Sequence, residues 1–184
     1  LTTRRQRQMC IRDRYQALRA GLRRCDGIFV THHHVDHIYG LDEVRRFNAL
    51  MQEPIDLFAE ERTLDAIHRV YRHIFDAAKN LNPSFVAHVR THRVTTDGSV
   101  SRMGIRATPI RLLHGKMPIL GWRFDAVDAA GAALNDLPGP FPFAWCTDCS
   151  AIPPESWPRL EGLRHLFLDM LRPRSHPTHF CLDE

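Results

Sequence analysis

The sequence predicts an α+β fold in which helices cover sheets. Three observations predict it: short apolar runs bounded by turn residues, amphipathic stretches with helical spacing, and a histidine-rich motif directly after the first apolar run. The chain has 184 residues, 43% of them hydrophobic, which suits a single domain. It contains no apolar run of the roughly 20 residues that a bilayer requires, and we therefore expect a cytoplasmic protein.

The first half alternates between the two element types. Residues 15–26 have apolar side chains at helical spacing, and residues 27–31 form a short apolar, β-branched run that predicts a buried strand. A helix is expected over 41–51, a strand opened by a proline over 54–59, and an amphipathic helix over 63–75.

From Ser84 the periodicity changes, and the sequence predicts a meander of antiparallel strands with a turn at Asp97-Gly98. Further strands are expected over residues 119–127, 141–148 and 163–171. A loop over 128–140 and a proline-rich connection over 150–160 separate them.

The net charge of +4 lies in residues 1–14, which contain five arginines and one aspartate. We expect this segment to be non-native sequence or a disordered basic arm, and we assign residues 15–184 to the domain. The remaining residues are neutral in sum, and a neutral body lacks the positive surface of a protein that binds phosphate backbones. We therefore do not expect nucleic acid or membrane partners.

Five cysteines at irregular spacing predict reduced thiols rather than a disulfide framework. Cys146 and Cys149 form a C-x-x-C pair, which alone is a weak signal for redox chemistry or zinc. We interpret the pair as two small buried thiols.

The segment HHHVDH (32–37) is the strongest functional signal. His32 and His34 are two residues apart, so in extended backbone they point to one side and can bind one ion. Asp36 and His37 follow the turn and would reach a second ion, whereas His33 points away from this set. Imidazole and carboxylate ligands suit zinc, manganese or iron. The alternative is a solvated histidine-rich loop.

Four segments resemble the metallo-β-lactamase superfamily of metal-dependent hydrolases: FVTHHHVDHIYGLDEVRRFN, IRLLHGKMPILGWRF, FAWCTDCS and FLDMLRPRSHPTHFCLDE. Together they are most similar to the phosphodiesterase branch that acts on phosphoribosyl 1,2-cyclic phosphate. The resemblance implies a four-layer αβ/βα sandwich, which we expect to be incomplete at both ends of this chain.

The resemblance also implies a site. His114 would complete a three-histidine set with His32 and His34, and Asp148 would bridge two metals. The alternatives are a histidine bonded to backbone and a helix cap, respectively. His179 would be a non-ligand histidine that assists the leaving group, and His176 is the weaker candidate for that role.

We therefore expect a binuclear hydrolase with two divalent ions, Zn or Mn, that cleaves a small or cyclic phosphodiester with a metal-activated water. The family's usual seventh ligand is not present after His179, so we expect a fragment with a weaker second metal site. The alternatives are a thioester or lactone hydrolase and a non-catalytic metal-binding domain. The partners we consider are a small-molecule substrate and a second copy of the chain in a homodimer.

Overall fold

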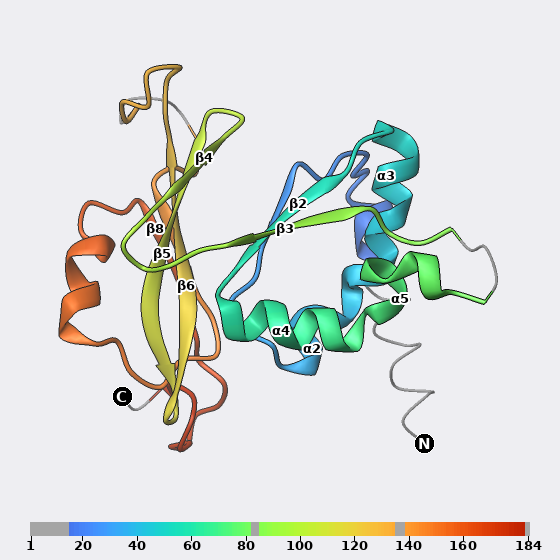
Figure 1. The fold of residues 1–184 in the computed structure, drawn as a ribbon. Coiled ribbons are helices and arrows are strands. Elements are labelled where there is room, and N and C mark those ends of the chain that lie inside the picture. The colour runs from blue at the N-terminus through green and yellow to red at the C-terminus, as the bar shows by residue number, and fades with distance from the viewer. Residues whose placement is uncertain (1–14, 82–84, 135–138, 183–184) are drawn as a thin grey trace. The chain divides into compact units, whose positions relative to one another are not determined.

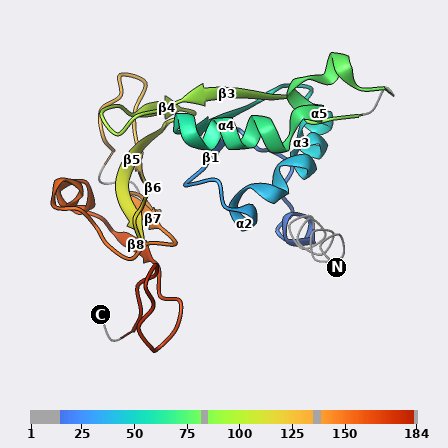
Figure 2. The same ribbon diagram turned by 60° about the horizontal axis from the view of Figure 1, so that its bottom comes forward.

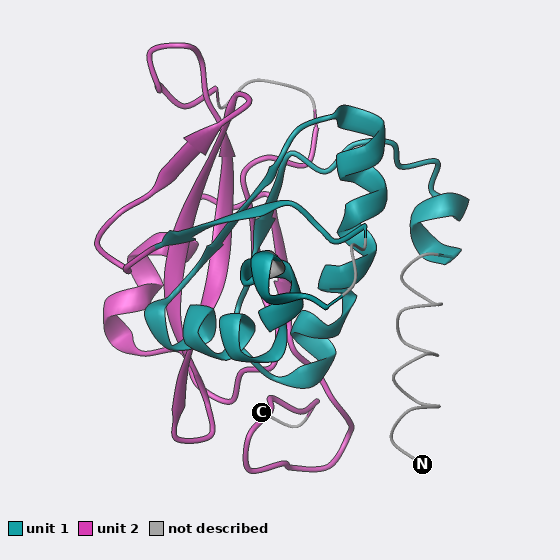
Figure 3. Ribbon diagram, turned by 45° about the vertical axis from the view of Figure 1, so that its right-hand side comes forward, with its two compact units in different colours: residues 1–93 teal, residues 94–184 magenta. Residues whose placement is uncertain are grey.

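The structure, a computed structural model, describes residues 15–81, 85–134 and 139–182. The chain divides into two compact units, residues 1–93 and 94–184, coloured separately in Figure 3. Each unit has its own sheet. The basic segment 1–14 lies outside the described residues.

The first unit contains a three-stranded parallel sheet in the order β1 (Gly27–Phe29), β2 (Ile55–Ala59) and β3 (Val89–Arg93). All five residues of β2 are buried, as expected for the central strand of a parallel sheet covered by connecting segments. Val30 extends the pairing beyond β1, since its amide donates to the Phe58 carbonyl at 3.0 Å. The histidine motif therefore starts at the carboxyl end of β1.

Two helical connections link these strands, because parallel strands need crossover segments. The first contains α2 (Val35–Ile38), the 3₁₀ helix η1 (Tyr39–Val44) and α3 (Arg45–Met51). The second contains α4 (Glu61–Val70), α5 (Arg72–Phe75) and the 3₁₀ turn η2 (Ala77–Lys79), and α4 is drawn beside the strands in Figure 1. Residues 15–19 are also helical.

Apolar side chains from these helices pack against one face of the first sheet. Leu57 of β2 and Ile67 of α4 are both fully buried, and Tyr71 joins the same cluster. The Tyr71 hydroxyl donates to the Ile38 carbonyl at 2.8 Å, which connects the second crossover to the first. Of the apolar residues on one face of the helix expected over 63–75, Leu64, Ile67, Tyr71 and Ile74 are buried, whereas Val70 is 45% exposed.

The opposite face of this sheet carries stacked aromatic rings and a cluster of charged side chains, the ion cluster. The Phe29 and Phe58 rings stack with centroids 5.1 Å apart, and His92 stacks on Phe58 at 4.9 Å. The Asp56 carboxylate is buried, and it accepts hydrogen bonds from Arg90 Nε and His92 Nε2, both at 2.8 Å. A buried carboxylate needs such donors to offset its lost hydration.

One strand was assigned wrongly from the sequence. The antiparallel meander was expected to begin near residue 84, but β3 pairs in parallel with β2 and belongs to the first sheet. The physical reason is that β3 follows a helical crossover, which returns the chain in the direction of the preceding strand. The antiparallel pattern begins only at β4.

The second unit contains a five-stranded sheet whose strands lie side by side in the order in which they occur in the sequence. Its strands are β4 (Val100–Arg102), β5 (Ile105–His114), β6 (Met117–Ala126), β7 (Phe143–Cys146) and β8 (His165–Leu168). The pairs from β4 to β7 are antiparallel, and the β7–β8 pair is parallel. The 3₁₀ helix η3 (Pro154–Leu160) lies in the proline-rich connection between β7 and β8.

The core of the second unit lies on one face of this sheet. Ile110, Leu112 and Ile119 are fully buried there, together with Cys146 and Cys149. Leu160 and Phe180 pack against them from the segments that follow β7 and β8. The expected α+β class, with two sheets and covering helices, is confirmed.

Strand β8 is the last strand of its sheet, and all four of its residues are exposed. Leu166, Phe167 and Leu168 are between 44% and 49% exposed, although all three are apolar. The Phe167 ring lies against the Trp145 ring, with centroids 5.2 Å apart. The outer edge of β8 is therefore both apolar and open among the described residues.

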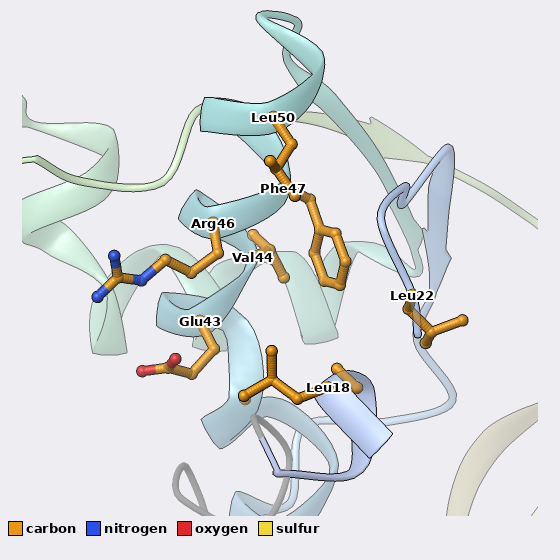
Figure 4. Close-up of a pocket in the computed structure, with 9 residues that line it drawn as sticks. Leu18, Leu22, Glu43, Val44, Arg46, Phe47 and Leu50 are labelled. Atoms are coloured by element: carbon orange, nitrogen blue, oxygen red, sulfur yellow. The ribbon is translucent and has the colours of Figure 1, made fainter. Parts of the chain in front are cut away.

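An apolar pocket of about 370 Å³ lies in the first unit between residues 17–22 and the segment of η1 and α3. In Figure 4 the side chains of Val44 and Phe47 extend from the segment of η1 and α3 toward Leu18 and Leu22. None of its lining residues is a predicted metal ligand. Within the described residues, no helix combines the length and the apolar character needed to cross a membrane.

Candidate metal centre

The histidine motif forms the loop between β1 and α2. His32 is buried, with 2% of its surface exposed. Its ring centroid lies 4.6 Å from that of His34 and 4.1 Å from that of His37. A ligand atom of His32 comes within 4.8 Å of a ligand atom of His34 and also of His37. These three imidazoles are close enough for pairs of them to share an ion.

Thr31 positions two of these rings, and the sequence reading did not include it. Its hydroxyl oxygen lies 3.1 Å from His32 Nδ1 and 3.4 Å from His37 Nδ1. A hydrogen bond at Nδ1 orients an imidazole and makes Nε2 the coordinating atom, as in many metal sites. The only signal in the sequence was its position directly before the motif.

Asp36 and His33 are near these rings but, within the described part of the chain, belong to no group of three possible ligands. The Asp36 side chain is 68% exposed, and its Oδ2 lies 3.8 Å from His37 Nε2. Among the described residues, no group of three or more side chains close enough to hold an ion includes Asp36 or His33. Partial burial, followed by the charge of Arg62, lowers the pKa of His33. The assignment of Asp36 as a ligand stays a prediction.

The second unit brings together His114, Asp148 and His179, whose ligand atoms all lie within 4.8 Å of one another. His114 is the last residue of β5, Asp148 follows β7 by two residues, and His179 lies on the loop after β8. These residues come from three separate segments of the chain. Folding of the second sheet therefore assembles this group.

The turn after His114 fits closely against the loop that carries His179. Residues 115 and 116 connect β5 to β6 in a two-residue hairpin, and Gly115 has a φ of +62°. A Cβ atom at Gly115 would lie 2.8 Å from Thr178 Cγ2, so only glycine fits both the backbone and the space. His114 Nδ1 donates to the Thr178 carbonyl at 2.7 Å. This bond leaves Nε2 of His114 as its coordinating atom.

Asp148 has a left-handed backbone with a φ of +55°. The Thr147 hydroxyl donates to Asp148 Oδ1 at 2.9 Å, which helps to orient the carboxylate. Left-handed backbone is uncommon outside glycine, although aspartate adopts it more readily than most residues. A conformation of this kind at a strand end often accompanies a functional role.

The cysteines that flank Asp148 are buried and free, as expected from the sequence. Burial raises the pKa of Cys146 and of Cys149 to about 12. Only a thiolate is a strong nucleophile or metal ligand. Both residues therefore act as neutral packing groups beside the carboxylate.

His179 is held by a carboxylate that the sequence reading missed. Its Nδ1 lies 2.6 Å from Asp169 Oδ2, and the two side chains are 15% and 11% exposed. The His179 ring packs edge-on against that of His114, with centroids 4.7 Å apart. Asp169 directly follows β8, so an acidic residue at a strand end was the available signal.

His176 also lies near His179, with ring centroids 5.1 Å apart. Its Nδ1 accepts a hydrogen bond from the Thr178 amide at 3.4 Å and lies 3.3 Å from the Thr178 hydroxyl oxygen. Desolvation, followed by the charge of Arg172, lowers the pKa of His176. The structure thus gives His176 and His179 different surroundings.

The two sets of donors belong to different units. His32, His34, Asp36 and His37 lie in the first, and the group of His114, Asp148 and His179 lies in the second. All the donor atoms are imidazole nitrogens or carboxylate oxygens, a set that suits a divalent ion such as zinc or manganese. The residues present therefore fit the divalent metals that the motif implied.

Other histidines have structural partners. His73 Nε2 lies 2.8 Å from Asp42 Oδ1, and His68 Nε2 lies 3.3 Å from the Thr91 hydroxyl. His92 belongs to the ion cluster around Asp56 described above. These contacts give the three histidines structural roles in the first unit.

Comparison with known proteins supplies the family. Residues 2–184 match the family described as "Beta-lactamase superfamily domain". A solved structure described as a new diphosphatase from the PhnP family is 35% identical with a TM-score of 0.73, and the match covers 92% of this chain and 57% of that one. Human tRNase Z, short form, is 20% identical with a TM-score of 0.47, over 73% of this chain and 53% of that one.

A curated protein from Porphyromonas gingivalis (strain ATCC BAA-308 / W83), named "Octanoyltransferase", is 29% identical over 172 residues. The match covers 93% of this chain but only 31% of that protein. The chain thus spans about a third of this relative and little more than half of the similar diphosphatase. By the family match over residues 2–184, the chain belongs to the beta-lactamase superfamily, and it has the metallo-β-lactamase fold.

Proposed function

We propose that the chain is a phosphodiesterase that uses two divalent metal ions, Zn or Mn, to cleave a small or cyclic phosphodiester. The observation that carries the proposal is the Asp169–His179 pair beside His114 and Asp148. A histidine held at Nδ1 by a carboxylate is oriented for proton transfer through Nε2. The similar diphosphatase of the PhnP family supports chemistry at phosphorus.

In this proposal six residues are the metal ligands. His32, His34 and His114 would hold one ion, Asp36 and His37 would hold the other, and Asp148 would serve both. Family membership supports this assignment, and so does the donor chemistry within each unit. The second ion has fewer imidazole ligands and is expected to bind more weakly.

The protein groups then divide the chemistry among them. When bound, two such ions supply an activated water and Lewis acidity toward the phosphoryl oxygen. His179, protonated at both ring nitrogens, would donate its Nε2 proton to the departing oxygen and keep its Nδ1 proton in the hydrogen bond to Asp169, which fixes the orientation of the ring. Thr31 and the Thr178 carbonyl hold His32, His37 and His114 in place through their Nδ1 atoms.

The test compares two alanine variants by metal content and turnover. His32→Ala should lose bound metal and activity together, whereas His179→Ala should retain metal and lose most of its rate. His68→Ala, an exposed histidine outside the site, is the matched control and should change neither. Loss of metal in His179→Ala to the same extent as in His32→Ala would contradict the role of His179.

The substrate class is tested separately with three reporter compounds. The metal-loaded protein is assayed with bis(p-nitrophenyl) phosphate, a thioester and a lactone. Preference for the phosphate supports the proposal, and preference for either carbonyl compound contradicts it. A protein that binds metal but cleaves none of the three would be a non-catalytic metal-binding domain.

We also propose a cytoplasmic location. The four described cysteines are free thiols, which is typical of reducing compartments. Fractionation of cells that express a tagged chain tests this assignment, and recovery from a membrane or secreted fraction would contradict it.

A further inference from the structure

The Ser150 side chain holds the backbone on both sides of His114. Its hydroxyl donates a hydrogen bond to the Leu113 carbonyl at 3.2 Å and accepts one from the Gly115 amide at 2.9 Å. Leu113 comes directly before His114, and Gly115 comes directly after it. A single hydroxyl group therefore bonds to both of the peptide groups that flank a proposed metal ligand.

Backbone pairing alone joins the same two segments on only one side of His114. Leu113 and Ala151 form an isolated antiparallel bridge, in which the Leu113 amide donates to the Ala151 carbonyl at 3.0 Å. The Ser150 amide also donates to the Leu113 carbonyl, at 2.7 Å. These backbone bonds all involve Leu113, whereas the Gly115 amide donates to the Ser150 hydroxyl. The hydroxyl thus adds the contact that holds the turn beyond His114.

The backbone that follows Asp148 is anchored at consecutive residues. Asp148 has a φ of +55°, and a conformation of this kind persists where neighbouring contacts over-determine it. The Cys149 carbonyl accepts a hydrogen bond from the Phe180 amide at 2.6 Å, and Ser150 is bonded to the end of β5. Figure 2 shows the loop that follows β8, in dark red, projecting beyond the end of that strand. The position of Asp148 is therefore linked to that of the turn after β5.

We propose that Ser150 is a positioning residue for the metal centre, whose hydroxyl fixes the position of His114 relative to Asp148. The inference rests on the proposed function, in which these two residues would serve the same ion. Ligands that are already held in their binding arrangement lose less conformational freedom when the ion binds. Without the hydroxyl, the turn after His114 would adopt more conformations and the ion would bind more weakly.

The test compares Ser150→Ala with Ser156→Ala in the full chain. Ser156 is a matched control because its hydroxyl also donates to a carbonyl of β5, that of Arg111, at 2.7 Å. Ser156 is buried, with 2% of its surface exposed. Each variant therefore loses a serine hydroxyl that bonds to the β5 backbone, but only Ser150→Ala loses contacts beside His114.

Zinc affinity is measured by calorimetric titration, and ligand arrangement by the visible absorption of the chain loaded with cobalt(II). Ser150→Ala should bind the first zinc ion about tenfold more weakly, an effect typical of losing a group that orients metal ligands. Its cobalt(II) absorption should also differ from that of the unmodified chain. Ser156→Ala should lower the Tm but leave the zinc affinity and the absorption unchanged. Ser150→Thr keeps a hydroxyl and should restore the zinc affinity.

Two results would overturn the inference. One is a zinc affinity of Ser150→Ala equal to that of the unmodified chain. The other is a loss of affinity as large in Ser156→Ala or in Ser150→Thr as in Ser150→Ala, because the effect would then not belong to this one hydroxyl.

These measurements also separate the inference from the proposed activity. An unmodified chain that binds zinc but does not cleave bis(p-nitrophenyl) phosphate would contradict the phosphodiesterase proposal, while the comparison of the serine variants would still test the role of Ser150. If the unmodified chain binds neither zinc nor cobalt(II), the ligand assignment fails and this inference fails with it.

Discussion

Substitution of Gly115 by alanine tests whether the hairpin turn after His114 organises the group of His114, Asp148 and His179 in the second unit. Two costs are expected. The left-handed backbone at φ +62° costs an alanine about 1–2 kcal/mol. The new Cβ would also lie 2.8 Å from Thr178 Cγ2, and relief of such crowding in a packed region costs about 1–3 kcal/mol.

Gly162→Ala separates these two costs. Gly162 has a similar φ of +66°, but a Cβ there would meet nothing within 4 Å. The control therefore carries the backbone cost alone. The difference between the two variants, about 1–3 kcal/mol, measures the crowding against Thr178. In a chain of this size it corresponds to roughly 2–12 °C in Tm.

The assay is thermal unfolding of both variants, together with calorimetric titration with zinc. Gly115→Ala should unfold at the lower temperature and bind zinc more weakly, because a shift of Thr178 moves the carbonyl that orients His114. Gly162→Ala should bind zinc as the unmodified chain does. Equal Tm values and equal zinc affinities in the two variants would refute the reasoning.

Asp169→Asn should retain the shape of its contact with His179 but lower kcat by about 10–100-fold, with metal content unchanged; restored kcat in Asp169→Glu would support a positioning role. Cys146 and Cys149, with pKa values raised to about 12, should resist alkylation at pH 8 in the folded protein. Because their folded pKa values exceed the unfolded value, stability should fall as pH rises from about 9 to 12, by about 1.4 kcal/mol per pH unit for each thiol; a flat profile measured by urea unfolding would contradict this. Ile119→Ala, at a fully buried position, should cost about 2–5 kcal/mol in denaturant unfolding, and a cost below 1 kcal/mol would contradict the packing described.

Local patterns allowed much of the fold to be predicted. The strand at 27–31, the strand at 54–59 and the helix at 63–75 correspond to β1, β2 and α4 with α5, because each has a clear period over consecutive residues. The parallel pairing of β3 was missed, since its partner β2 lies some thirty residues away and alternation alone does not give strand direction.

The candidate site shows the same division between local and distant information. His32, His34 and His37 stand within six positions of one another, so their spacing was enough to suggest a metal site. His114, Asp148 and His179 were identified through resemblance, because each lies on a different segment of the chain. The groups that orient the histidines, Thr31, Asp169 and Thr178, were missed.

These groups were missed for a physical reason. Hydroxyl, carboxylate and carbonyl groups are common at the ends of strands, and only the folded backbone shows which of them reaches an imidazole. Asp169 lies ten residues before His179, and Thr178 lies 64 residues after His114, so no periodic pattern joins either pair. Orientation of ligands is therefore the part of the site that a single sequence reveals least.

The apolar outer edge of β8 has a consequence for handling the protein. Open strands usually carry lysines, prolines or bulges that discourage another chain from extending the sheet. Residues 166–168 are Leu-Phe-Leu and offer no such protection. At high concentration we therefore expect the outer edge of β8 to pair with the same edge of a second molecule. Light scattering that grows with concentration, and that a lysine in place of Leu166 suppresses, would be the sign of this self-association.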